Sequence, residues 1–121
     1  MMFARFDPER GALDVVNAGM PDPMIVRKSG AMELLAFEGD RLPLGARRAS
    51  EYRATTTTIE RGDKLVAVSD GLPEAMLNGA PIGYERTEEL VKRMTSIDAL
   101  FESVKPARID DDLTVVVLER V

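Results

Sequence analysis

The stretch "DKLVAVSDGLPEAM" (residues 63–76) places a carboxylate and a glycine directly after a run of apolar residues. Residues 65–68 are all apolar, which is typical of a strand that is covered on both faces. Asp70 stands where this strand would end, and Gly71 follows it. Because glycine has no side chain, backbone or a hydrated cation can approach the carboxylate closely. The stretch therefore predicts a buried strand with a carboxylate at its end.

The composition excludes several kinds of chemistry. The chain has no cysteine and no histidine, which excludes disulfides, thiolate chemistry, Ser-His-Asp catalysis and nearly all zinc sites. Its formal net charge of −5 argues against general nucleic-acid binding, which requires a basic surface. No apolar run approaches the roughly 20 residues of a membrane helix, and the N-terminus lacks a signal-peptide core. We therefore expect a cytoplasmic protein that binds neither nucleic acid nor membranes.

The first half of the chain predicts strands joined by tight turns. An Asp-Pro turn ending in Gly11 separates two β-prone segments, and Ser29-Gly30 separates two more, so we expect two hairpins. Four consecutive threonines favour a half-exposed strand, and "RGD" (61–63) would turn the chain into the buried strand. The expected strands cover residues 1–6, 12–18, 23–28, 31–37, 51–60 and 64–69, with a loop at 38–46.

The second half changes to helical spacing of its apolar residues. We expect one helix over residues 84–94 and another over 96–104, with Thr95 and Asp98 marking the start of the second. A β-prone strand closes the chain after an acidic loop. No linker or internal repeat divides the sequence, so residues 1–121 form a single domain. The helical positions expected to face the core are Leu90, Val91, Met94, Ile97, Leu100, Phe101 and Val104.

Carboxylates stand at the ends of two predicted strands. Asp70 follows one strand, and the acidic triplet 110–112 precedes the last one. If these strands are antiparallel neighbours, Asp70 and Asp111 converge at one rim of a sheet. Two close carboxylates repel each other unless a proton or a cation lies between them, and oxygen ligands favour Mg²⁺, Mn²⁺ or Ca²⁺. The alternatives are structural: Asp-Gly is a common turn, and an acidic triplet before a strand is usually a solvated loop.

Five motifs occur in an order that resembles a known family. The motifs are "ARFDPERGALDVVNAG" (4–19), "RLPLGA" (41–46), "RGDKLVAVSDGLPEA" (61–75), "PIGYERTEELV" (81–91) and "DDLTVVVLER" (111–120). With these motifs the chain is similar to the SpoIIE/RsbU-type bacterial phosphatases of the metal-dependent PPM class, which are related to the type 2C serine/threonine phosphatases. The resemblance implies an α+β fold, an antiparallel β-sandwich with flanking helices (αββα), of which this chain is the C-terminal portion, incomplete at the N-terminus.

The resemblance also implies a metal site. In the family, acidic side chains hold two Mn²⁺ or Mg²⁺ ions, and a water between the metals attacks a phosphoserine or phosphothreonine. Asp70 matches the ligand of the family's "DG" motif, and Asp111 matches the first acid of its terminal "DD" motif. Gly71 clears space beside the first ligand, and Asp112 orients the site from behind the ligands. No side chain other than the metal ligands is assigned a catalytic role.

A third motif resembles the family's "NAGH". Asn17 and Gly19 match it and imply a structural turn near the metal site. Met20 stands where the family motif has histidine, so any polar task of that side chain is absent here.

These resemblances imply a regulatory phosphatase. The expected substrate is a phosphoprotein such as an anti-sigma-factor antagonist, in a signal-transduction pathway that controls a sigma factor. The family's bridging aspartate lies upstream of the matched motifs, so we expect the chain alone to be weakly active or inactive. We also expect an uncovered sheet edge, which a partner or a second copy would cover. The alternative function is a catalytically inactive adaptor or output domain that binds a regulatory protein.

Overall fold

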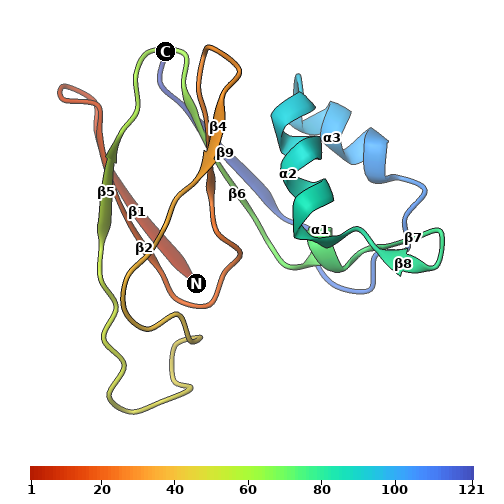
Figure 1. The fold of residues 1–121 in the computed structure, drawn as a ribbon, viewed down its shortest axis with the longest axis horizontal. Helices are drawn as coiled ribbons and strands as arrows, with labels where there is room; N and C mark the ends of the chain where they lie inside the picture. Colours follow the sequence, from red (N-terminus) through yellow and green to blue (C-terminus); the bar gives the residue numbers. More distant parts are fainter.

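The computed structural model describes residues 1–121. Nine strands and three helices make up the fold (Figure 1). The strands are β1 (Met2–Asp7), β2 (Ala12–Asn17), β3 (Met24–Val26), β4 (Met32–Leu34), β5 (Thr55–Thr58), β6 (Lys64–Val68), β7 (Met76–Leu77), β8 (Ala80–Pro81) and β9 (Val115–Glu119). The helices are α1 (Gly71–Glu74), α2 (Gly83–Arg93) and α3 (Ile97–Val104).

Two antiparallel sheets pack face to face. The first sheet has the order β1-β2-β5, and the second has the order β4-β3-β6-β9. Along β2 the side chains alternate between buried and half-buried, as expected for a strand with one face on the core. Leu13 and Val15 point inward from β2, and Ile25 and Leu65 meet them from the second sheet. These contacts form the core between the sheets.

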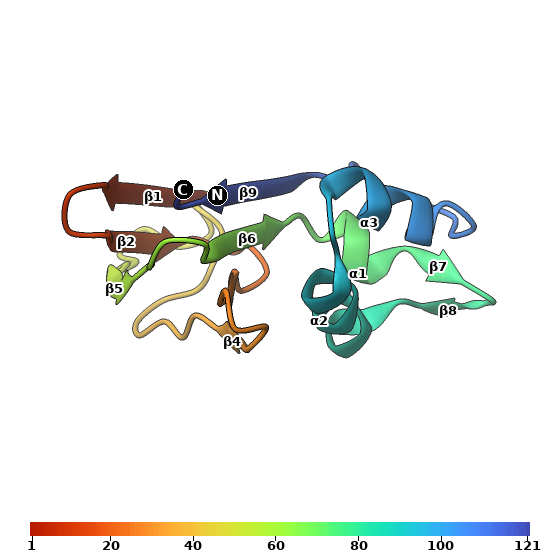
Figure 2. The same ribbon diagram turned by 90° about the horizontal axis from the view of Figure 1, so that it is seen from above.

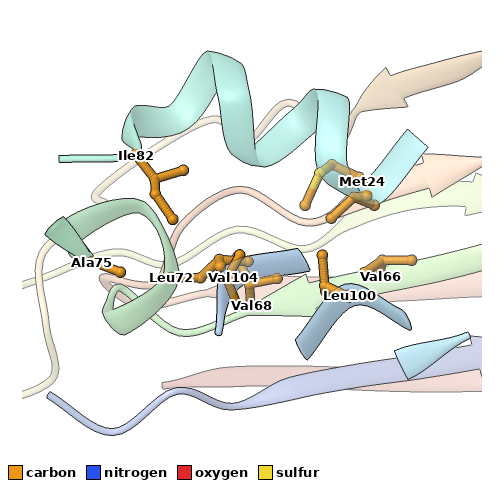
Figure 3. Close-up of a cluster of buried hydrophobic side chains, with 9 residues drawn as sticks. Met24, Val66, Val68, Leu72, Ala75, Ile82, Leu100 and Val104 are labelled. Atoms are coloured by element: carbon orange, nitrogen blue, oxygen red, sulfur yellow. The ribbon is translucent and has the colours of Figure 1, made fainter. Parts of the chain in front are cut away.

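The helices cover the other face of the second sheet. Val66 and Val68 of β6 pack with Leu72 of α1, Val91 of α2 and Val104 of α3. Most of this second core is drawn in Figure 3. Figure 1 shows the three layers side by side, with the first sheet, the second sheet and the helices in turn from left to right. The strand β6 is therefore buried on both faces, which explains its nearly continuous apolar sequence.

The α+β sandwich and most elements expected from the sequence are confirmed. Both hairpins form, with β1 antiparallel to β2 and β3 antiparallel to β4. The two longer helices lie where the helical spacing places them. Predictions for two residues were wrong. The N-cap of α3 is Ser96 rather than Thr95, and its hydroxyl accepts the Ala99 N–H at 3.0 Å. Phe101, expected in the core, is 38% exposed. Phe101 lies one residue beyond the buried Leu100, so it falls outside the narrow apolar stripe of a two-turn helix.

The sequence analysis missed a small hairpin after Asp70. The short strands β7 and β8 pair across Asn78-Gly79, and both turn residues have positive φ angles, 55° and 82°. Asn-Gly between two apolar pairs is the strongest short signal for such a turn, so this hairpin was predictable.

Both sheets have an open edge on the same side of the molecule. The strand β1 is an edge of the first sheet, β9 is an edge of the second, and Figure 2 shows them along the same side. Phe3 of β1 is 62% exposed and Val116 of β9 is 58% exposed. The expected uncovered edge is therefore present, and its cover by a partner or a second copy stays a prediction. No helix has the length and apolar character needed to cross a membrane.

Candidate functional site

The structure brings the backbones of Asp70 and Asp111 to one rim of the second sheet. The strands β6 and β9 are antiparallel neighbours, with Val68 opposite Val115. The segment after β6 and the segment before β9 therefore meet. Ser69 ties them together, because its hydroxyl donates to the Asp112 carbonyl at 2.8 Å and accepts the N–H of Thr114 at 2.9 Å. The antiparallel pairing that the sequence analysis set as a condition is present, and the meeting of the two carboxylates stays a prediction.

Gly71 is required at this rim by close packing. A Cβ atom on Gly71 would lie 2.4 Å from the carbonyl oxygen of Asp112 and 3.1 Å from that of Asp111. Both neighbours are backbone atoms, which cannot move away as a flexible side chain would. The glycine therefore lets the start of α1 lie directly against the acidic loop. The glycine of the Asp-Gly pair is therefore needed for close packing against the acidic loop and not only for the turn of the backbone.

The two carboxylates differ in what they contact within the chain. Asp70 is exposed and forms no hydrogen bond or ion pair through its side chain, while Asp111 accepts the N–H of Asp112 at 2.7 Å. Asp110, the first acid of the triplet, is instead paired with Arg108 at 2.9 Å. The free oxygens of Asp70 and Asp111 are donors of the kind that Mn²⁺ and Mg²⁺ prefer.

The number of donors is smaller than a hard cation needs. The chain contains no group of three or more acidic side chains placed to hold a metal ion together. A hard cation seeks about six oxygen ligands, so two carboxylates would need water or another segment to complete the set. The oxygen donors are thus of the kind that Mn²⁺ or Mg²⁺ needs, but they make up only part of a full ligand set. Metal binding by Asp70 and Asp111 stays a prediction.

The Asn17 turn is held together by a buried amide. Asn17 is 3% exposed, and its Nδ2 donates to the Met20 carbonyl at 2.9 Å and to Asp22 at 3.3 Å. Its Oδ1 accepts the Met20 N–H at 2.9 Å. Gly19 has a φ of 82°, and a Cβ there would lie 2.8 Å from Pro43. The motif therefore forms a tight turn onto which the loop containing Pro43 packs.

This turn and Asp70 line one cavity. The cavity has a volume of about 420 Å³, and its floor includes Met24 of β3 and Val68 of β6. Side chains of α1 and α2 form one wall, and the Asn17 turn and the following loop form the other. The polar and charged lining residues are Asp22, Arg41, Asp70, Glu74, Tyr84, Thr87 and Glu88. Asp111 and Asp112 do not line this cavity.

The sequence analysis missed the charged residues that line this cavity together with Asp70. Arg41 forms an ion pair with Asp22, and its guanidinium lies 6.0 Å from the centre of the Phe37 ring. The Tyr52 hydroxyl donates to the Leu42 carbonyl at 2.9 Å and so fixes the backbone next to Arg41. The "RLPLGA" motif was the available signal for this segment, but nothing in its spacing indicated a partner 19 residues earlier.

The solved structures that this chain resembles include phosphatase domains. The SiaA-PP2C domain of Pseudomonas aeruginosa superimposes with a TM-score of 0.78 at 17% identity, covering 98% of this chain and 50% of that one. The Mn-presoaked phosphatase domain of SpoIIE from Bacillus subtilis gives 0.73 at 20% identity, covering 98% and 55%. The RsbU and RsbW domains of Rv1364c from Mycobacterium tuberculosis give 0.75 at 20% identity, covering 96% and 34%. The fold is therefore that of the PP2C-type phosphatases.

The sequence assigns the family. The family model described as Stage II sporulation protein E (SpoIIE) matches residues 1–121, and the chain belongs to this family. No curated protein matches the sequence. The chain spans about half the length of the SiaA and SpoIIE phosphatase domains that it resembles.

Proposed function

We propose that this chain is part of a metal-dependent protein serine/threonine phosphatase of the bacterial regulatory type. The observation that carries the proposal is the placement of Asp70 and Asp111 on adjoining segments at one rim of the second sheet, with Asp70 facing a cavity. Membership of the SpoIIE family supports it. The substrate we propose is a phosphoprotein such as an anti-sigma-factor antagonist. The M. tuberculosis relative, whose structure contains an RsbU and an RsbW domain, supports a role in such a regulatory pathway.

Each residue at the rim has a distinct task in this proposal. Asp70 and Asp111 would hold Mn²⁺ or Mg²⁺, which when bound supplies a water nucleophile at neutral pH and stabilises charge on the phosphoryl group. Ser69 keeps the two strand ends in register, since its hydroxyl bonds to both sides of the Asp112–Thr114 segment. Gly71 lets α1 lie against the acidic loop. The Asn17 turn forms the opposite wall of the cavity in which the phosphorylated side chain would lie.

The test combines metal binding with hydrolysis. Calorimetric titration of the chain with Mn²⁺ should show binding that Asp70→Asn and Asp111→Asn each weaken by about tenfold or more. Asp110→Asn is the matched control, because Asp110 belongs to the same triplet but is paired with Arg108. Hydrolysis of a phosphoserine peptide with Mn²⁺ should respond to the same variants. Hydrolysis that survives Asp70→Asn would contradict the assigned role, and the absence of any Mn²⁺ binding would contradict the metal site.

A catalytically inactive adaptor is the second candidate, and one observation favours it. Met20 lines the cavity at the position of the family's histidine, and Asn17 binds its backbone N–H and carbonyl, so the turn is kept without the polar side chain. An adaptor of this kind would bind a regulatory protein through the same cavity without turnover. Tight binding of two Mn²⁺ ions together with hydrolysis would exclude the adaptor. The substitution Met20→His also separates the two candidates, because introducing the family's histidine should raise hydrolytic activity only if the chain is a phosphatase.

A further inference from the structure

Arg41 is the one cationic side chain among the residues that line the Asp70 cavity. The other charged lining residues are all acidic: Asp22, Asp70, Glu74 and Glu88. Of these four carboxylates only Asp22 is paired with a cation, and its partner is Arg41 itself. A dianionic phosphate that entered this cavity would meet repulsion from the three remaining carboxylates. Arg41 is the only lining side chain whose positive charge can reduce that repulsion.

The position of Arg41 is built by several contacts. Asp22 accepts from Arg41 and is itself bound by the buried Asn17 amide at 3.3 Å. The guanidinium lies over Phe37 at 6.0 Å, a distance at which a cation and an aromatic ring attract each other. The backbone on the C-terminal side is fixed by the hydrogen bond from Tyr52 to the Leu42 carbonyl. Such contacts on both sides distinguish Arg41 from a freely moving surface arginine.

The guanidinium keeps donors free for a ligand. Its only hydrogen bond in the structure runs from Nη2 to Asp22, and 46% of the side chain is exposed. An arginine has five N–H donors in a planar fork, so most of them remain available. This geometry suits bidentate binding to phosphate oxygens, which a lysine cannot reproduce. A fixed, half-exposed arginine in the same cavity as Asp70 therefore has the chemistry of a phosphate-binding group.

We propose that Arg41 binds the phosphate of a phosphorylated serine or threonine side chain in this cavity. The proposal rests on the phosphatase function proposed above, and it assigns substrate recognition to a residue that the metal site does not use. Asp22 is a positioning residue, because it orients the guanidinium without contacting the phosphate. Mn²⁺ held by Asp70 would strengthen phosphate binding, since it would neutralise one of the unpaired carboxylates.

The experiment measures peptide binding with the full chain, with and without Mn²⁺. A fluorescent phosphoserine peptide and its unphosphorylated form are titrated against the wild-type chain, Arg41→Gln, Arg41→Lys and Arg48→Gln. The control residue Arg48 lies in the same loop, is exposed, forms no ion pair and does not line the cavity. Arg41→Gln should lower affinity for the phosphopeptide by about tenfold, and Arg41→Lys should fall between it and the wild type. Arg48→Gln should change affinity by less than about twofold.

Thermal unfolding of each variant shows that a loss of binding is not a loss of fold. Equal binding of the two peptides by the wild-type chain, or unchanged phosphopeptide binding by Arg41→Gln, would overturn the proposal. Hydrolysis measured in parallel separates it from the proposed function. Arg41-dependent binding with neither hydrolysis nor Mn²⁺ binding would support the recognition role and contradict the phosphatase. Mn²⁺-dependent hydrolysis with an unchanged KM in Arg41→Gln would support the phosphatase and contradict the recognition role of Arg41.

Discussion

The strand β6 has an aspartate at each end, and the two carboxylates have opposite surroundings. Asp63, before the strand, is 4% exposed and accepts the N–H groups of Lys28 at 2.9 Å and Glu60 at 3.0 Å. It also pairs with Arg27 at 2.9 Å. Asp70, after the strand, is exposed and accepts nothing. A carboxylate whose oxygens are all used within the chain stabilises the fold, whereas one left free on a cavity is available to a ligand.

The electrostatics of Asp63 agree with a structural role. Burial opposes ionisation of this carboxyl, but the hydrogen bonds from Lys28, Arg27 and Glu60 outweigh burial and hold its pKa below the usual range. The hydrogen bond between Arg27 and Asp63 in turn raises the pKa of the Arg27 guanidinium. Arg27 also pairs with Glu33, so the network joins β3 and β4 to the turn before β6. The end of the sandwich that contains Asp63 is thus internally closed.

Replacing Asp63 should produce the largest loss of stability. Asp63→Ala leaves two backbone N–H groups without their acceptor and removes one of the three acceptors of the Arg27 guanidinium, which should cost about 3 kcal/mol. Urea unfolding followed by far-UV circular dichroism measures this free energy. Asp110→Ala is the control, since Asp110 is exposed and its pair with Arg108 should contribute less than about 1 kcal/mol. Equal losses in the two variants would contradict the distinction between the ends of β6.

The next effect concerns the opposite end of β6, where packing rather than charge constrains the chain. Gly71→Ala would place a Cβ 2.4 Å from the Asp112 carbonyl oxygen, and the cost should be about 2 kcal/mol. Gly30→Ala is a matched control with nothing within 4 Å of the added atom, so it should cost only about 1 kcal/mol through its positive φ. Urea unfolding of both variants separates contact from backbone strain. A Gly71→Ala chain as stable as the wild type would show that the acidic loop moves freely.

Acidification should remove the stabilisation that the folded chain gains from ionised Asp63. Because the pKa of Asp63 is lower in the folded chain than in the unfolded one, the unfolded state binds more protons as the pH falls. The stabilisation from Asp63 is fully present above the unfolded pKa of about 3.9 and disappears as the pH falls through the folded value. Asp63→Asn should therefore reduce the slope of the unfolding free energy against pH below about pH 5. An unchanged slope would assign the acid sensitivity to other groups, such as Asp14 and Asp40, whose pKa values are also lowered.

The sequence predicted the elements on either side of β6 better than the contacts that join them. Continuous apolar residues identified β6, threonine-rich sequence identified β5, and helical spacing identified α2 and α3. These signals are local, because each depends on residues within one element. The antiparallel pairing of β6 and β9 was only a condition in the sequence analysis, and the structure shows that it is met.

The Asp63 network could not be predicted in the same way. "RGD" at residues 61–63 is a turn, as expected, but its aspartate pairs with Arg27, 36 residues earlier. Nothing in the spacing of the two residues indicates that contact, since it depends on how β3 lies against β6. The pair of Arg41 and Asp22 was missed for the same reason. Local sequence therefore identified the carboxylate that is free, and only tertiary packing showed which carboxylate is already used.

The smallest expected effect is on Asp70 itself. Without metal, Asp70→Asn removes a charge that has no partner and no hydrogen bond, so the unfolding free energy should change by less than about 0.5 kcal/mol. The variant should be slightly more stable than the wild type if the negative charge of Asp111 is felt across the rim, because one of two like charges is removed. Urea unfolding in the presence of a chelator measures the change, with Asp63→Asn as the contrasting variant. A loss above about 1 kcal/mol would mean that Asp70 stabilises the fold as Asp63 does, because a free carboxylate has no such contribution to lose.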